Sequence, residues 1–117
     1  MEIQTYQNKA IRTLASCGSI QNDNLHMTLG LLTEVGEIAD VFKKNLAYGK
    51  EIDWINIKEE VGDTMWYIAN LCNINNWNLT EILDTNIKKL EVRYPDKFSS
   101  DKAINRNLEV ERKILEA

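Results

Sequence analysis

The chain has 117 residues, of which 44% are hydrophobic and 27% are charged, and its formal net charge is −4. This length fits one domain, and this composition argues against a disordered chain and against a membrane protein. No apolar run approaches the ~20 residues that span a bilayer, and the segment Met1–Thr5 lacks the basic-then-apolar layout of a signal peptide. We therefore expect a cytoplasmic protein with a single helical domain over residues 1–117.

Acidic and basic residues are unevenly distributed along the chain. Residues 1–85 contain 6 Lys and Arg against 12 Asp and Glu, whereas residues 86–117 contain 8 against 6. A net acidic chain without a basic stripe binds nucleic acid polymers poorly, because duplex affinity depends on neutralising phosphates. The imbalance suits a metal ion and a phosphate ester that meet between the two parts, although random surface variation explains it equally well.

Cysteine and histidine are too few for several chemistries. Cys17 and Cys72 stand alone, and His26 is the one histidine, whereas structural zinc requires clustered Cys and His ligands. We expect both cysteines to be buried, since free cysteine behaves as a small hydrophobic residue. We expect His26 to be an ordinary helix residue with a hydrogen-bond partner.

Helical periodicity recurs along the chain and strand-like alternation is nearly absent, which predicts an all-α fold. The expected helices cover residues 2–16, 24–47, 54–74, 79–94 and, with a weaker pattern, 101–115. The expected N-caps are Asn22 or Asp23 for the second helix, Asp53 for the third and Asn78 for the fourth. Gly49 and Pro95 are expected to stop the second and fourth helices. The prediction is a small antiparallel helix bundle of about four main helices plus a C-terminal helical segment.

Apolar stripes on the second and third helices are expected to face the core. The stripe of the second helix consists of Leu31, Val35, Ile38 and Phe42, with Leu32, Ala39 and Leu46 alongside. The stripe of the third helix consists of Ile57, Val61, Met65, Ile68 and Cys72.

Two acidic pairs lie beside these stripes. Glu34 and Glu37 share one face of the second helix, and Glu60 and Asp63 share one face of the third. If the two helices pack antiparallel, the four carboxylates converge. Two carboxylates ~6 Å apart repel by roughly 3 kcal/mol at an effective dielectric constant of 20, so protonation or a divalent cation must relieve the repulsion. Oxygen ligands favour Mg²⁺, with Mn²⁺ as a substitute; the alternative is that both pairs make surface salt bridges.

Each acidic pair encloses a glycine, Gly36 or Gly62, which we expect to permit close approach of a neighbouring backbone. A ferritin-like di-iron centre is disfavoured, because it requires Glu-x-x-His motifs that the chain lacks.

Cationic residues follow on the fourth helix. Asn86, Lys89 and Arg93 share a face, Lys88 is adjacent, and Lys97 follows Pro95. Such a face suits a polyphosphate, since arginine binds phosphate bidentately; the alternative is an ordinary basic face near a helix C-terminus. The aromatic residues near the third helix offer a surface for a base or for packing, and they are Trp54, Trp66, Tyr67 and Trp77.

The chain resembles the MazG-like all-α nucleoside triphosphate pyrophosphohydrolases, and its two ends look like a phage-associated branch of that family. The segments that carry the resemblance are Leu29–Asp40, Glu59–Asp63 with Trp66–Tyr67, Asn86–Leu90 and Arg93–Pro95. The resemblance implies hydrolysis of a nucleoside triphosphate between the α- and β-phosphates, which gives the monophosphate and pyrophosphate. It implies a homodimer or homotetramer with sites near the subunit interface.

The resemblance also implies roles for particular residues. The implied Mg²⁺ ligands are Glu34, Glu37, Glu60 and Asp63. The implied substrate contacts are Asn86, Lys89 and Arg93, with Tyr94 and Lys97 in the turn that follows. We expect Glu37 to accept the proton of the attacking water. The alternative function is a non-catalytic helical module for dimerisation or nucleotide sensing, which the strong apolar stripes would also support.

Overall fold

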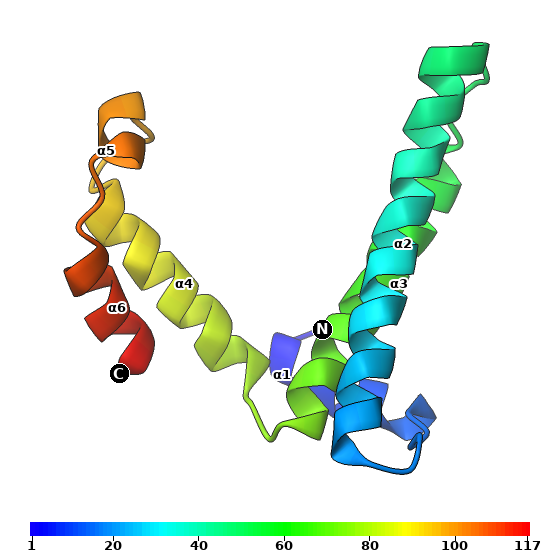
Figure 1. Cartoon of the computed structure of the whole chain (residues 1–117), viewed down its shortest axis with the longest axis horizontal. Helices are drawn as coiled ribbons and strands as arrows, with labels where there is room; N and C mark the ends of the chain where they lie inside the picture. Colours follow the sequence, from blue (N-terminus) through cyan, green and yellow to red (C-terminus); the bar gives the residue numbers. More distant parts are fainter. The chain divides into compact units, whose positions relative to one another are not determined.

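The computed structural model describes all 117 residues, and every regular element in it is helical. The elements in chain order are α1 (Ile3–Ala10), the 3-10 turn η1 (Ile11–Thr13), α2 (Ile20–Tyr48), α3 (Trp54–Ile74), α4 (Leu79–Arg93), α5 (Ser100–Ile104) and α6 (Leu108–Glu116). The predicted all-α fold is confirmed. The chain forms two compact units, residues 1–77 and 78–117 (Figure 1); one domain over residues 1–117 stays a prediction.

None of the helices combines the length and the apolar character needed to cross a membrane.

Local capping explains where the helices begin. The third helix has the predicted bounds, and the Asp53 side chain accepts a hydrogen bond of 3.1 Å from the backbone N–H of Asn56. The second helix begins four residues earlier than predicted, because Ser19 caps it. Asp23, an expected cap, instead accepts a hydrogen bond from the backbone N–H of Cys17, which ties the preceding loop to α2. The weak pattern after Pro95 corresponds to two short helices, α5 and α6, where one was expected.

The larger unit is built on an antiparallel hairpin of α2 and α3 (Figure 1). Gly49 ends α2 with φ of 66°, a left-handed conformation that glycine adopts without strain. Only residues 50–53 then lead into α3, so the two helices run back along each other.

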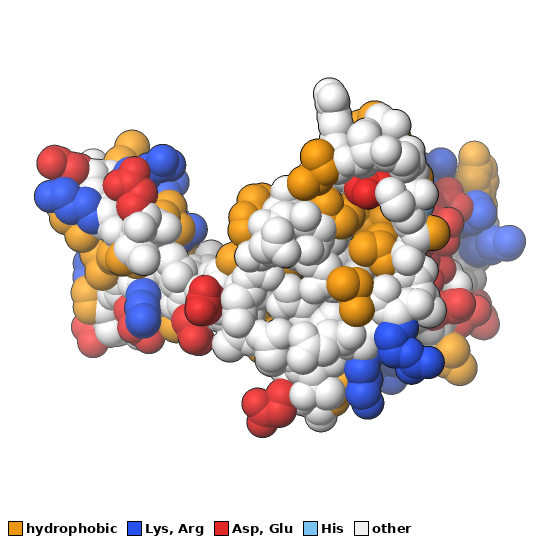
Figure 2. Space-filling view, turned by 90° about the horizontal axis from the view of Figure 1, so that it is seen from below, with side chains coloured by type: hydrophobic (Ala, Val, Ile, Leu, Met, Phe, Trp, Pro, Cys, Tyr) orange, Lys and Arg blue, Asp and Glu red, His pale blue; other side chains and the backbone are white.

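The hairpin interface matches the predicted stripes only in part: Cys72 is buried, and Leu31, Ile38, Ile57, Met65 and Ile68 are partly buried. Val35 and Val61, both assigned to core-facing stripes, are 47% and 50% exposed. The buried positions on the two helices include Met27, Gly30 and Glu60. Periodicity identified the apolar stripe of each helix, but the buried positions extend beyond it to neighbouring residues, among them Glu60. Part of the apolar surface is therefore left open, and Figure 2 shows hydrophobic side chains at the surface.

A buried amide network attaches α1 to the C-terminal half of α3. Asn70 is fully buried, and its side-chain N–H donates to the carbonyl oxygen of Ala10 at 3.1 Å. Asn73 donates to the carbonyl oxygen of Gln7 and to the side-chain oxygen of Asn70, both at 3.0 Å. Because buried amides are costly without partners, this network fixes the position of α1 on α3.

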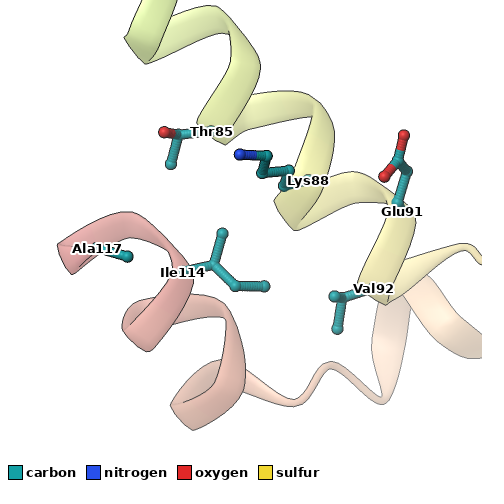
Figure 3. Close-up of a pocket in the computed structure, with 6 residues that line it drawn as sticks. All are labelled: Thr85, Lys88, Glu91, Val92, Ile114 and Ala117. Atoms are coloured by element: carbon teal, nitrogen blue, oxygen red, sulfur yellow. The ribbon is translucent and has the colours of Figure 1, made fainter.

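In the smaller unit, α6 packs against α4. Between them lies a groove of about 440 Å³. Ile114 of α6 points toward α4, whereas Glu91 of α4 points away from α6 (Figure 3).

Candidate metal centre

The α2–α3 hairpin brings three of the four predicted metal ligands together. Glu34 is half-buried, Glu37 is exposed, and Glu60 is only 6% exposed. One carboxylate oxygen from each lies within 4.8 Å of the others. The expected convergence of acids from two antiparallel helices is therefore present for these three residues.

Glu60 is the buried member of this cluster. Its Oε2 atom is enclosed by protein and has no hydrogen-bond partner. Hydrogen bonding with Glu34, followed by burial, raises the pKa of Glu60 above its ordinary range. Hydrogen bonding with Glu60, followed by repulsion from it, raises the pKa of Glu37. Both pKa values rise because carboxylates in close contact repel each other when ionised, and a shared proton or a cation relieves this repulsion.

The donor set fits a hard divalent cation. Three carboxylates provide oxygen ligands only, and the buried oxygen of Glu60 lacks the partner that such an ion would supply. The adjacent Glu59 is exposed and is not one of the three grouped acids. Glu60, and not Glu59, is therefore the acid of this turn that belongs to the cluster.

Asp63, the fourth predicted ligand, is exposed and lies at the edge of the cluster. It lines a hollow of about 250 Å³ together with Glu34, Trp66 and Tyr67. Its charge contributes to the raised pKa values of Glu37 and Glu60. The structure thus places Asp63 next to the cluster but not among the three tightly grouped oxygens.

Tyr6 of α1 is a neighbour of this site that sequence reasoning did not select. Its hydroxyl donates to the carbonyl oxygen of Gly62 at 3.5 Å. Burial, followed by the negative charge of Asp63, raises the pKa of Tyr6. No sequence spacing links Tyr6 to Asp63, because the contact joins α1 to α3.

The prediction for the two enclosed glycines is wrong. A Cβ atom built on Gly36 or Gly62 would meet no atom within 4 Å. The close approach is at Gly30, where a Cβ atom would overlap the ring of Tyr67. Gly30 lies on the buried face of α2, whereas the two predicted glycines lie on open faces.

Aromatic side chains surround the hollow beside Asp63. The rings of Trp66 and Tyr67 meet edge-to-face with centroids 5.0 Å apart, and Tyr67 contacts His26 in the same way at 6.3 Å. The indole N–H of Trp66 donates to the hydroxyl of Thr13 at 2.8 Å. Trp66 and Tyr67 therefore pack against protein on one side and line the hollow on the other. The remaining tryptophans, Trp54 and Trp77, lie elsewhere and are exposed.

The two cysteines differ in environment. Cys72 is buried as predicted, and burial raises the pKa of its thiol. Cys17 is exposed, contrary to the prediction, because it lies in the loop before α2. Its sulfur lies 3.4 Å from Nδ1 of His26, which gives His26 the expected polar neighbour.

The predicted substrate-contacting residues all belong to the smaller unit. Asn86 and Lys97 are exposed, and Lys89 and Tyr94 are partly exposed. Arg93 is held by an ion pair with Glu111 of α6, with Nε to Oε1 at 2.6 Å. Glu111 was not selected from the sequence, and its signal there is weak: an acid three residues before Ile114 on the face of α6 that meets α4.

Known proteins are similar to this chain over the segments that carry the acidic cluster and the basic face of α4. The family described as the MazG nucleotide pyrophosphohydrolase domain matches residues 22–98. The Gene 37 protein of Mycobacterium phage L5 is 32% identical over 104 residues, and the match covers 80% of this chain and 89% of the phage protein. No solved structure matches the chain. With the match covering all four acidic positions and the basic face of α4, the chain belongs to the MazG nucleotide pyrophosphohydrolase domain family, in its phage-type branch.

Proposed function

We propose that this protein is a Mg²⁺-dependent nucleoside triphosphate pyrophosphohydrolase, which cleaves between the α- and β-phosphates and releases the nucleoside monophosphate and pyrophosphate. The observation that carries the proposal is the cluster of Glu34, Glu37 and Glu60, with its buried carboxylate oxygen that lacks a partner, in a chain of the MazG family. The carboxylates of such a cluster repel each other in the metal-free protein, and a bound cation replaces this repulsion with attraction.

The acidic residues are proposed to serve in metal binding and in proton transfer. Glu34, Glu37 and Glu60 are proposed to hold the ion, with Asp63 contributing from the adjacent hollow. When bound, Mg²⁺ supplies charge neutralisation for the phosphates and lowers the pKa of the attacking water. Glu37 is the exposed acid of the cluster, so water can reach its carboxylate, which is proposed to accept the proton of the attacking water. No covalent enzyme intermediate is required.

The basic face of α4 is proposed to bind the phosphates of the substrate. The residues assigned to it are Asn86, Lys89, Arg93, Tyr94 and Lys97. Lys89 and Arg93 supply charge-assisted hydrogen bonds, which are stronger than neutral ones.

The test is product analysis over a panel of nucleoside triphosphates in the presence of Mg²⁺. The expected products are the monophosphate and pyrophosphate, with turnover abolished by EDTA and greatly lowered by Glu37→Gln. Release of orthophosphate, or absence of turnover with every nucleotide, would contradict the proposal. Nucleotide binding without turnover would instead favour a sensing module.

We further propose that the protein is a homo-oligomer in which α2 meets a second copy. Exposed apolar residues repeat along α2 with alternating three- and four-residue spacing, as in a helix seam: Leu32, Val35, Ala39, Phe42 and Leu46. Leu46 is 89% exposed. A row of this kind supports helix pairing, because burying it removes apolar area from water.

Oligomeric state can be measured by light scattering after size-exclusion chromatography. The native chain is expected to elute as a dimer or tetramer, and Leu32→Glu is expected to shift it toward the monomer. Ile104→Glu is the control, since Ile104 is also apolar and exposed but lies on α5. A native monomer would remove this part of the proposal.

A further inference from the structure

The smaller unit contains an ionic cluster at the junction of α4, α5 and α6. The carboxylate of Glu111 is 3% exposed, and the Arg93 side chain is 14% exposed. Arg93 Nε lies 2.6 Å from Oε1 of Glu111, and Arg106 Nη2 lies 2.9 Å from Oε2. Arg106 Nε adds a second bond to Oε2 at 3.1 Å. One buried carboxylate thus pairs with two guanidinium groups, one at each of its oxygens.

The bonds to Glu111 use only part of the donor capacity of these arginines. A guanidinium carries five N–H donors, whereas Glu111 accepts from Nε of Arg93 and from Nε and Nη2 of Arg106. Hydrogen bonding from Arg93, opposed by burial and reinforced by Arg106, lowers the pKa of Glu111 below its ordinary range. The carboxylate therefore stays ionised at neutral pH and keeps both arginines in place.

A small pocket opens onto this cluster. Its volume is about 200 Å³, and its lining residues include Arg93, Lys102, Arg106 and Glu111, with Asn105 and Asn107 beside them. The charged lining residues are three cations and one carboxylate, which leaves an excess positive charge of two. The volume is below the ~300–1,000 Å³ of pockets for drug-sized ligands. The pocket therefore suits a small, multiply charged anion with several acceptor oxygens.

We propose that this pocket is a binding site for a phosphate-bearing anion of the pyrophosphate class, with Arg106 and Lys102 as ligands beside Arg93 and with Glu111 as the positioning residue that fixes the two guanidinium groups. The proposal rests on the proposed function, since pyrophosphate is the product of that reaction and also forms part of its substrate. Paired guanidiniums match such an anion because each presents parallel N–H donors in a fixed plane.

A purely structural role for the cluster leads to a different expectation. A buried ion pair can serve to orient two helices without binding anything. In that case removal of Lys102, which is exposed and makes no ion pair with Glu111, would change neither stability nor anion binding. Lys102 therefore distinguishes the two roles, and its removal leaves the ion pairs of Glu111 with Arg93 and Arg106 intact.

The experiment is titration calorimetry of the full chain with pyrophosphate in EDTA, so that no cation at the acidic cluster contributes. The native chain is expected to bind, and Lys102→Ala and Arg106→Lys are each expected to weaken the affinity about ten-fold, as for loss of a charge-assisted hydrogen bond. Arg112→Ala is the matched control, because Arg112 lies on α6 beside Glu111 but pairs with Glu116 at the surface. Thermal denaturation of each variant checks that it is folded.

Two further arms separate the source of the anion and the dependence on the proposed reaction. In the first, a non-hydrolysable nucleoside triphosphate replaces pyrophosphate. A lower affinity of Lys102→Ala for either ligand supports the site, and the ligand whose affinity falls shows whether the site binds the free anion or the phosphate tail of a nucleotide. In the second, Glu37→Gln is expected to bind pyrophosphate like the native chain although its rate of turnover is greatly lowered. Absence of binding by the native chain, or equal binding by Lys102→Ala and Arg112→Ala with both ligands, would overturn the proposal.

Discussion

The ring of Tyr67 on α3 lies directly against the backbone of Gly30 on α2. The same ring contacts Trp66 and His26, so it has neighbours on several sides. Since Tyr67 and Glu34 line one hollow with Asp63, this contact also sets the spacing of the helices at the acidic site.

Gly30→Ala is therefore expected to destabilise the protein. The added methyl group must displace the Tyr67 ring, and overpacking of this kind costs about 1–3 kcal/mol. Gly36→Ala, on the same helix with open space around the new Cβ, is the control and is expected to gain roughly 0.5–1 kcal/mol. Denaturant unfolding of the two variants measures both values, and equal effects would exclude the Gly30 contact as a determinant of stability.

Glu37→Gln is expected to lower the rate of nucleotide hydrolysis by about 10²–10⁴-fold, the usual contribution of a general base. Asp40→Asn is the matched control, because Asp40 lies three residues further along α2 and pairs with Lys43 and Lys44 at the surface. Rates measured with saturating Mg²⁺ should separate the two variants. Full activity in Glu37→Gln would remove this residue from the proton-transfer step.

Glu60→Gln is expected to stabilise the metal-free protein and to abolish its response to Mg²⁺. The pKa of Glu60 is raised in the folded state, so folding favours the protonated carboxyl. The stability gained in this way is present at low pH and is lost as the pH rises through the folded-state pKa. The stability of the native chain in EDTA should therefore fall as the pH rises from the ordinary range of a glutamate carboxyl through the raised pKa of Glu60. The stability of the Glu60→Gln variant should fall less over the same pH range.

Melting temperatures across a pH series, with EDTA or with Mg²⁺, provide the measurement. A cation at 100 times its Kd stabilises the folded state by about 2.7 kcal/mol. Glu59→Gln is the control, since Glu59 is exposed on the same turn of α3 and should retain the Mg²⁺ response. A melting temperature of the native chain that ignores Mg²⁺ at every pH would contradict a cation site here.

Asn70→Ala is expected to destabilise the fold through the α1–α3 contact. The change leaves the carbonyl oxygen of Ala10 and the amide of Asn73 without their buried partner, at a cost of about 1–3 kcal/mol. Asn8→Ala, whose side chain meets Gln4 at the surface, should change stability by less than about 0.5 kcal/mol. Chemical denaturation would show no difference between the two if the network were dispensable.

Several features followed from local sequence alone. Asp53 specifies the start of α3 because its carboxylate reaches the N–H of Asn56 three residues on. Gly49 specifies the end of α2 because it adopts positive φ. The i,i+3 spacing of the acidic pairs placed each pair on one helix face, and the short connection after Gly49 made antiparallel packing of the two helices the natural outcome.

The sequence by itself therefore determined an all-α chain, most of its helix ends and a set of acids on shared faces, since all of these depend on residues within one or two helical turns. Only the tertiary structure decided that Glu60 is buried while Val61 is exposed, that Gly30 meets Tyr67, and that Glu111 holds Arg93. A helix offers several faces, and its periodicity ranks them by apolar character only. Which face becomes an interface depends on partners 18 or more positions away, whose packing no local pattern encodes.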